Sequence, residues 1–320
     1  MIKLEKFKNN KVFKTYGGTT LALMLLIFLF SLLSPYFLKM NNIMNILLQV
    51  SIIAILAVGM TFVLMIGEID LSVASTLALS GVLVGVLVEK GITSIIAIAL
   101  VIFLLAITIG LFNGGLSAKF KIPTFIVTVA SMQIIRGIGY ATTDSKPIAI
   151  SDNFLIAIGN FKVFNVIPLP IIIMLVIAVI AHVILSKTKF GRQLKMIGGN
   201  KKASIYSGIK VNKMQVYVFM ISAMTAAISG ILMASRLYSA QPNVAQSYEL
   251  DAIASAVLGG TSLNGGQGTI LGTIIGAIIM GVVNNGMNLI GLEYFYQQIV
   301  KGVIIVIAVL IDVRSKRRVI

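Results

Sequence analysis

The chain has 320 residues, of which 58% are hydrophobic and only 11% are charged, and its mean hydropathy is +1.02. Soluble domains carry about 25% charged residues, so this composition excludes an ordinary soluble protein and indicates one surrounded by lipid. The net charge of +16 comes from blocks of Lys and Arg between apolar segments, which is typical of membrane-protein loops and not of nucleic-acid binding. Cysteine is absent, which excludes disulfides and thiol chemistry.

The first predicted element is an apolar segment, residues 21–33, that follows a basic start at residues 1–14. A cleaved signal peptide would end in small residues of the A-x-A kind, but the sequence continues as Ser-Pro-Tyr-Phe at 34–37. We therefore expect an uncleaved first span with its N-terminus in the cytoplasm.

The rest of the chain predicts an all-α membrane protein of about ten spans, because each span needs about 20 mainly apolar residues. The eighth candidate is short and rich in Gly, Ala and Ser, so it is expected to be a half-helix or re-entrant piece, and the count is eight to ten. The candidate spans are residues 19–38, 43–66, 71–88, 94–116, 123–143, 166–186, 214–235, 249–263, 268–291 and 296–313. Residues 1–320 are expected to form a single transmembrane domain.

Basic residues orient these spans. Four blocks lie before the first span, after the fourth, between the sixth and seventh, and after the last, and with ten spans all four fall on one side. The positive-inside rule then places both termini in the cytoplasm, whereas the long loop at 144–165 on the other side is neutral. The blocks are Lys3, Lys6, Lys8, Lys11 and Lys14; Lys119 and Lys121; Lys187, Lys189, Arg192, Lys195, Lys201, Lys202, Lys210 and Lys213; and Arg314, Lys316, Arg317 and Arg318.

No motif indicates catalysis by the chain itself. The sequence has no G-x-x-x-x-G-K-[ST] loop for nucleotide phosphates and no G-x-S-x-G elbow. The only histidine, His182, lies in an apolar run without a second His or Cys, so a structural or snorkelling role is expected for it. We expect no catalytic residue, no metal site and no cofactor.

A polar turn, Gly-Glu-Ile-Asp-Leu-Ser at 67–72, joins two apolar spans. Carboxylates so close to lipid must face water, protein or the interface. One interpretation is a tight turn at the cytoplasmic edge, with water available and with Asp70 or Ser72 capping the next helix. The other is a proton or cation site at these two carboxylates, Glu68 and Asp70.

The segment at 191–208 reads GRQLKMIGGNKKASIYSG and predicts a short amphipathic helix within a basic loop at 187–213. Asn200 is expected to cap this helix, Gly208 to end it in the left-handed conformation, and Ala203, Ile205, Tyr206 and Ile209 to provide apolar contacts. A plain positive-inside loop is one interpretation. The glycines at both ends favour the other, a docking helix that sits in a groove of a cytoplasmic partner.

A glycine-rich stretch at 259–268 interrupts a membrane segment, and Gly268, Gly272 and Gly276 follow at four-residue spacing. A broken helix is tolerated in a membrane where it is buried in protein or lines water. The spaced glycines form a close-packing stripe. This stripe packs helices within one subunit or lies at a central pore or dimer seam, and the sequence leaves both alternatives open.

Amide side chains inside the spans are candidates for a polar pathway. Asn284 and Asn288 lie one helical turn apart, with Asn285 beside them, and Gln133 and Arg136 form a similar pair in the fifth span. Amides both donate and accept hydrogen bonds, which suits neutral sugars, and they also bond helix to helix.

These motifs together resemble one family. The turn at 67–72, the loop GR…IGGN…A…SGI at 191–209 and the stretch LGGTSLNGGQGTILGTIIGA at 258–277 are similar to permease subunits of bacterial ribose-type ABC importers, a family that includes xylose, galactose and autoinducer-2 carriers. The family turn usually reads GGIDLSVGS, and this chain departs from it at Glu68 and Ala74. The resemblance covers almost the whole chain.

The resemblance implies a multi-pass inner-membrane protein with partners. Two permease subunits, as a homodimer, would bind two cytoplasmic ATPases and receive solute from an extracytoplasmic sugar-binding protein, while ATP-driven motion opens the pathway alternately to each side. The family's ATPase-coupling segment matches Gly191, Arg192, Gly199, Asn200, Ala203 and Gly208.

Two rival classes predict other features. An ion-coupled secondary carrier needs buried ionisable residues with partners at mid-membrane. Glu68, Asp70, Glu249 and Asp251 lie near predicted span ends, which leaves Arg136 and Lys301 as exceptions. A lipid-modifying enzyme needs a nucleophile with a base, or a metal pair, and neither is present. The sequence does not identify the solute.

Overall fold

The computed structural model describes residues 11–317 and the side chains of residues 17–310, and it is almost wholly helical. Lys3, Lys6, Lys8 and Arg318 of the predicted basic blocks lie outside the described residues. The helices are α2 (Lys11–Leu33), α3 (Met40–Met65), α4 (Val73–Glu89), α5 (Ser94–Gly110), the π-helix η1 (Leu111–Gly115), α6 (Leu116–Phe120), α7 (Thr124–Thr143), α8 (Asn153–Asn160), α9 (Leu169–Lys187), α10 (Lys189–Gly199), α11 (Lys201–Tyr206), α12 (Val211–Arg236), α13 (Tyr248–Leu258), α14 (Ile270–Leu289) and α15 (Tyr294–Arg317).

Six of the described helices are long and apolar enough to cross a membrane: α3, the continuous α5–η1–α6 unit, α7, α9, α12 and α14. Shorter apolar stretches lie in α2, α4 and α15. The predicted eighth span is α13, which has 11 residues and is therefore only about 16 Å long at 1.5 Å per residue. The structure thus confirms a polytopic helical protein, with α13 too short to cross a bilayer alone.

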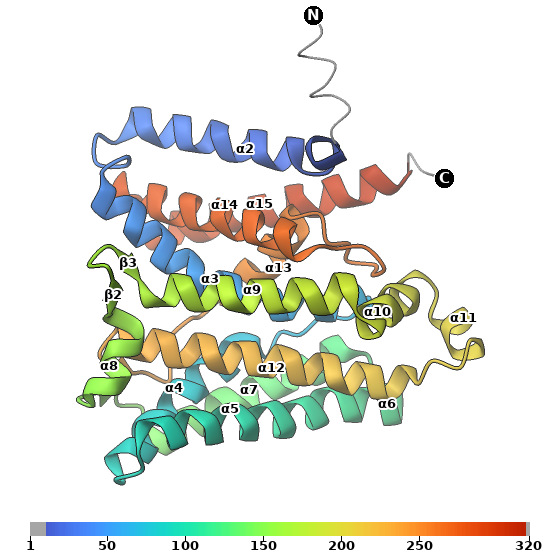
Figure 1. The fold of residues 1–320 in the computed structure, drawn as a ribbon, viewed down its shortest axis with the longest axis horizontal. Helices are drawn as coiled ribbons and strands as arrows, with labels where there is room; N and C mark the ends of the chain where they lie inside the picture. Colours follow the sequence, from blue (N-terminus) through green and yellow to red (C-terminus); the bar gives the residue numbers. More distant parts are fainter. Residues whose placement is uncertain (1–10, 318–320) are drawn as a thin grey trace, which may run out of the picture.

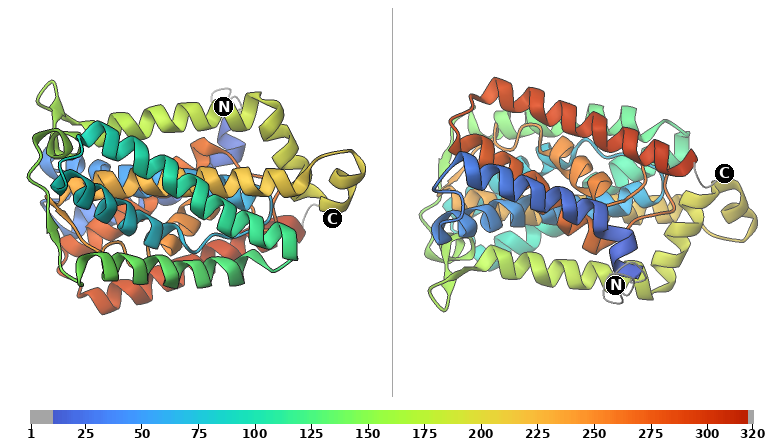
Figure 2. Two further views of the ribbon diagram at one scale, coloured as in Figure 1. Left: turned by 90° about the horizontal axis from the view of Figure 1, so that it is seen from below. Right: turned by 90° about the horizontal axis from the view of Figure 1, so that it is seen from above.

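The long helices run roughly parallel to one axis of the molecule, which gives it two ends (Figure 1). One end carries α10 and α11 and is called the α11 end below; the other carries α8 and the strands and is called the α8 end. Figure 2 shows that α2 begins, and α15 ends, toward the α11 end. The predicted basic loop at 187–213 therefore lies at the same end as the described parts of the two terminal helices.

Four two-residue strands at the α8 end were not predicted. Strand β1 (Ile148–Ala149) pairs antiparallel with β4 (Ser239–Ala240), and β2 (Lys162–Val163) pairs antiparallel with β3 (Ile167–Pro168). The all-α prediction holds apart from these short ladders, in which Ala240 of β4 and Pro168 of β3 are buried and the paired backbones satisfy their polar groups.

The core of the molecule is formed by α3, α12 and α14. In the most apolar stretches of these helices 83%, 67% and 72% of the residues are buried, whereas the value for α9 is 28%. Small residues allow the close approach: Gly230 on α12 lies against the backbone of Leu77 on α4, where a Cβ atom would overlap the carbonyl. The peripheral helices expose large apolar side chains such as Phe103 and Val179, which suits lipid.

Candidate functional site

The predicted docking segment folds as two helices that meet at Asn200. The Asn200 Oδ1 atom accepts a hydrogen bond from the backbone N–H of Ala203 (2.9 Å), so the predicted cap of α11 is confirmed. Gly208 has φ of +78°, which confirms the predicted left-handed end. Of the predicted apolar contacts, that of Ile209 is made, because Ile209 is buried in the core, whereas Ile205 and Tyr206 are 56% and 90% exposed. The helix therefore presents apolar side chains outward.

The other predicted residues of this segment divide into buried and exposed ones. Gly191 is buried, and a Cβ there would overlap the Leu185 carbonyl at the turn between α9 and α10. Arg192 is exposed and its Nη1 donates to the Lys187 carbonyl (3.4 Å). Gly199 and Ala203 are exposed. Gly191 thus sets the angle between the helices, while the exposed residues form an open surface.

Three segments far apart in the sequence cross at the α11 end. The backbone N–H of Gly266, in the glycine-rich break, donates to the carbonyl of Met65 at the end of α3 (2.9 Å). A Cβ at Gly198 would overlap both of these atoms. Gly265, with φ of +87°, packs on the Gly198 backbone. We call this crossing of Met65, Gly198, Gly265 and Gly266 the backbone junction; sequence reasoning found its three segments separately but not their contact.

Glu68 adds side-chain links beside the backbone junction. Its Oε1 lies 3.1 Å from Lys201 Nζ on α11, and its Oε2 accepts a hydrogen bond from Thr124 Oγ1 at the start of α7 (2.7 Å). The carboxylate is mostly buried and Lys201 is half exposed. Glu68 therefore joins the docking segment to both the turn and α7.

The Asp70 carboxylate is buried, contrary to the prediction that it would have access to water. It is 1% exposed and accepts hydrogen bonds from Ser72 N (3.0 Å), Ser72 Oγ (2.6 Å) and Ser222 Oγ on α12 (2.8 Å). The cap prediction is also wrong: neither side chain caps α4, because Ser72 Oγ donates to Asp70 and accepts from Asn113 Nδ2 of η1 (2.8 Å). The turn is covered by α12 and η1, and its polar groups bond to one another, although Asn113 Oδ1 is buried without a hydrogen-bond partner among the described residues.

The glycine stripe packs within the chain. Gly272 and Gly276 on α14 face the backbone of α13 and the residue after it, where Cβ atoms would overlap the carbonyls of Gly259 and Ser255. A Cβ at Gly268 would lie 2.9 Å from Met65 Sδ. The alternative that places these glycines at a pore or dimer seam does not fit this geometry, since α13 and α3 already occupy their faces.

A second polar cluster lies between α13, α14 and α15. Asp251 Oδ2 is 3.0 Å from Lys301 Nζ and 3.4 Å from Asn284 Nδ2, and the side chains of Asp251 and Lys301 are 1% and 15% exposed. Asp251 Oδ1 and Asn284 Oδ1 are buried and have no hydrogen-bond partner in the described part of the chain. Asp251 was predicted near a span end, but packing of α13 between α14 and α15 buries it as an ion pair.

The remaining amides make separate contacts. Asn285 and Asn42 exchange two amide hydrogen bonds (2.9 and 3.0 Å) and join α14 to α3. Asn288 is exposed and its Oδ1 accepts from Gln297 Nε2 (2.8 Å). The structure therefore does not bring Asn288 into the cluster around Asp251, although it lies one turn from Asn284.

In the fifth predicted span, Arg136 is partly buried and Gln133 is exposed. Arg136 Nη1 donates to the carbonyls of Pro242 (2.7 Å) and Val244 (2.9 Å), in the segment before α13. Arg136 therefore fixes the position of the segment that precedes α13, a role that the sequence did not indicate.

Comparison with known proteins identifies the family. Residues 42–309 match the family described as "Branched-chain amino acid transport system / permease component". The chain belongs to this permease family. The ribose import permease protein RbsC of Bacillus subtilis is 46% identical over 296 residues, which cover 92% of each chain.

Two further relatives are named for other sugars. The L-arabinose ABC transporter permease protein AraH of Azospirillum brasilense is 36% identical over 304 residues, covering 94% of this chain and 89% of the relative. The D-allose transport system permease protein AlsC of Escherichia coli is 36% identical over 299 residues, covering 92% and 90%. No solved structure matches.

These matches confirm the predicted family and exclude both rival classes. The permease is a multi-pass inner-membrane transport subunit of an ABC import system, and its relatives are named as permeases and not as enzymes. The family description names amino acids, whereas the relatives aligned over nearly the whole chain are named for sugars, and the longer, more identical alignments carry more weight for this chain.

Proposed function

We propose that the permease moves a simple, ribose-like sugar through the membrane, as one half of a homodimer that works with two cytoplasmic ATPases and an extracytoplasmic sugar-binding protein. The names of the relatives support the solute class. In this arrangement the binding protein supplies the affinity for solute, and the permease supplies a pathway that opens alternately to the two sides.

The proposed topology has ten helices crossing or entering the membrane, with the α11 end in the cytoplasm. The ten predicted spans correspond to α2, α3, α4, the α5–η1–α6 unit, α7, α9, α12, α13, α14 and α15. The α11 end carries the basic segment 187–213, as the positive-inside rule requires of a cytoplasmic face. The neutral segment 144–165 lies at the α8 end.

The segment 187–213 is proposed as the ATPase-coupling loop, and one observation carries this proposal. Helix α11 is capped at Asn200, ends at Gly208, and leaves Tyr206 90% exposed, while the residues just before it are fixed at the backbone junction. An exposed aromatic side chain on a short, well-defined helix suits insertion into a groove of a partner. A force on α11 would then reach α3 and the glycine-rich break directly.

The proposed solute pathway includes Asn284, Asn288, Gln133 and Arg136. Asn284 Oδ1 and its neighbour Asp251 Oδ1 are hydrogen-bond acceptors without a donor in the described part of the chain. Sugar hydroxyls donate hydrogen bonds, so these atoms are suited to contact a solute when the surrounding helices separate.

The coupling of ATP hydrolysis to solute uptake is tested by changing one glycine at the α11 end and one at the α8 end of the molecule. Gly208→Val places a β-branched residue at a positive φ and should reduce solute uptake per ATP hydrolysed at least fivefold, because an αL conformation costs an L-residue about 1–2 kcal/mol and distorts the end of α11. Gly91→Val is the matched control: Gly91 also has a positive φ, of +84°, and open space around it, but it lies at the α8 end. Both are measured in vesicles that contain the reconstituted importer.

Equal coupling in the two variants would remove the docking role from α11. Uptake that continues without any ATPase would instead contradict the importer mechanism itself.

Asn284→Leu together with Asn288→Leu should slow uptake several-fold while the ATPases still co-purify with the tagged chain. Unchanged uptake in this variant would assign both amides to packing.

A further inference from the structure

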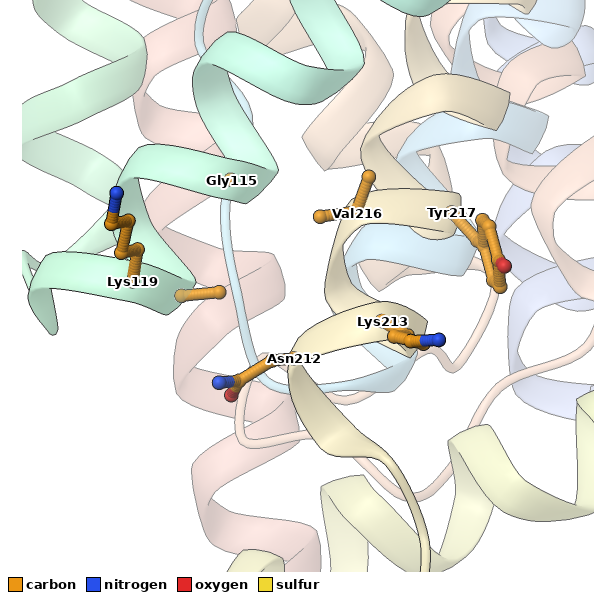
Figure 3. A pocket seen from close by; sticks show the side chains of 7 residues that line it. Gly115, Lys119, Asn212, Lys213, Val216 and Tyr217 are labelled. Carbon is orange, nitrogen blue, oxygen red and sulfur yellow. The ribbon is translucent and has the colours of Figure 1, made fainter.

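A pocket of about 530 Å³ lies at the α11 end between α6 and the start of α12 (Figure 3). Its lining includes Gly115 and Lys119 from η1 and α6, and Asn212, Lys213, Val216 and Tyr217 from α12. Figure 3 shows the two lysines on opposite sides of the pocket, one on each helix. Asn212 and Lys213 are the last residues of the segment 187–213, but the proposed docking contact is made by α11, which does not line this pocket.

The π-helix explains why the pocket exists. From α5 as far as Gly114 in η1, the chain packs closely on α12: a Cβ at Gly114 would lie only 2.7 Å from Val216 Cα. At Gly115 one face of the helix is open, because a Cβ there would meet no atom within 4 Å, while on another face Ser117 Oγ of α6 still accepts a hydrogen bond from Gln215 Nε2 of α12 (3.0 Å). The wide turn of the π-helix thus leaves a gap with apolar walls beside the Ser117–Gln215 contact, and π-helical turns are frequent at functional sites.

The rim of the pocket is basic. Lys119 and Lys213 are exposed and, within residues 17–310, have no ion-pair partner; the Lys119 Nζ lies 5.4 Å from the centroid of the Phe120 ring. A second pocket of about 280 Å³ shares Lys213 and Tyr217 and adds Lys210. No carboxylate lines either pocket in the described structure. The two pockets therefore form one uncompensated cationic groove.

The position of the groove adds to its chemistry. It lies where apolar helices end: Leu111 and Phe112 of η1 are 54% and 42% exposed, and Tyr217, a residue type enriched at the membrane interface, is half exposed. A free inorganic anion would gain nothing from the apolar walls. An amphiphile with an anionic head would use both the lysines and the walls, and basic pockets between transmembrane helices are known to hold such heads.

We propose that this pocket binds the headgroup of an anionic phospholipid. Its phosphate lies between Lys119 and Lys213, Asn212 donates to headgroup oxygens, and the glycerol and upper acyl carbons contact Val216 and Gly115. This site requires only that the chain is a membrane protein, so it is independent of the solute. Asn212 and Lys213 end the proposed coupling loop, and the site lies beside the docking surface of α11 without using it.

The test is native mass spectrometry of the detergent-purified full-length chain with equal amounts of phosphatidylglycerol and phosphatidylcholine. The wild type should retain phosphatidylglycerol at least fivefold more than phosphatidylcholine. Lys119→Gln and Lys213→Gln should each lower that retention about fivefold, since one lysine near an anionic headgroup contributes about this factor. Gly115→Leu, which fills the pocket without changing charge, should abolish it, and an unchanged melting temperature shows that the variant is folded.

Lys195→Gln is the matched control, because Lys195 is basic, exposed and at the same end but lines neither pocket. Retention should be unchanged in it, and excess inorganic phosphate should not displace the lipid. Four results would overturn the proposal: equal retention of the two lipids, normal retention by Gly115→Leu, displacement by inorganic phosphate, or release of the lipid when the ATPases bind.

Discussion

The permease contains two buried aspartates that are stabilised in different ways. Asp70 is surrounded by hydroxyl groups, and both of its oxygens accept hydrogen bonds from Ser72 or Ser222. Asp251 is paired with the ammonium of Lys301 through one oxygen, and its other oxygen has no partner in the described residues. Each is at most 1% exposed, so burial does not distinguish them.

This difference indicates different roles. A carboxylate with both oxygens occupied by neutral donors fixes the turn between α3 and α4 against α12 and η1, and the unpartnered buried atom of that network among the described residues is Asn113 Oδ1, not a carboxylate oxygen. A carboxylate with a free oxygen beside Asn284 leaves capacity for another donor. Removing one member of each cluster therefore has different consequences, which can be ranked.

The largest effect is expected for Lys301→Met. It leaves the Asp251 carboxylate buried without a counter-charge, which typically costs about 3–5 kcal/mol. Asp251→Asn should cost less, because Lys301 is 15% exposed and can extend its ammonium toward water. Both are measured by equilibrium unfolding in mixed micelles. The double variant should recover most of the loss, and a double variant as unstable as Lys301→Met would show that the pair is not coupled.

A smaller effect, about 1–2 kcal/mol, is expected for Asp70→Asn in the same assay. The remaining carbonyl oxygen can still accept from Ser72, and the Ser222 hydroxyl can turn from donor to acceptor toward the new amide. Ser222→Ala on α12 should cost a similar amount as a control for the same contact. If Asp70→Asn were as damaging as Lys301→Met, the distinction between the two aspartates would fail.

The ion pair of Glu68 with the half-exposed Lys201 provides a partly exposed reference for both buried groups. Glu68→Gln keeps an acceptor for Thr124 but loses the ion pair with Lys201, which is 52% exposed, so stability should fall by less than about 1 kcal/mol. A double-mutant cycle with Lys201→Gln measures the pair directly. The coupling should shrink at about 1 M salt, where charges are screened over a few ångströms. A salt-independent coupling would mean that the pair is effectively buried.

The smallest effect concerns Asp152 at the α8 end. Hydrogen bonds from Ser94 Oγ (2.6 Å) and from the backbone N–H of Leu155 (2.9 Å) lower the pKa of this carboxyl group. Its contribution to stability is therefore present above the ordinary Asp pKa of about 4 and is lost as the pH falls through the lowered folded-state pKa. The melting temperature should fall less between about pH 6 and pH 3 in Asp152→Asn than in the wild type. Equal slopes would contradict this role.

Much of the fold was predictable because its signals are local. The apolar stretches that form the helices, the Asn200 cap and the left-handed Gly208 each depend on residues close in sequence. The π-helix was not predicted, because nothing in Leu-Phe-Asn-Gly-Gly at 111–115 distinguishes a π-turn from an α-turn.

The candidate site was less predictable because its contacts are long-range. The Asp70 bond to Ser222 spans 152 positions, and the Asp251 bond to Lys301 joins two different helices. Sequence spacing placed Asn284 and Asn288 on one face but could not show that only Asn284 meets Asp251. Gly198 was overlooked, since its importance comes from the backbones of Met65 and Gly266 and not from its neighbours in sequence.

The backbone junction has a mechanical consequence. Side chains in contact can accommodate a displacement by changing rotamer, so such contacts are deformable. At Gly198 and Gly266 the main chains of two segments are in direct contact, so no side chain can change rotamer to accommodate a displacement. The backbone junction is therefore a rigid contact at the point where a displacement of α11 would reach the membrane helices. Most of that displacement should be transmitted to α3 and to the glycine-rich break before α14.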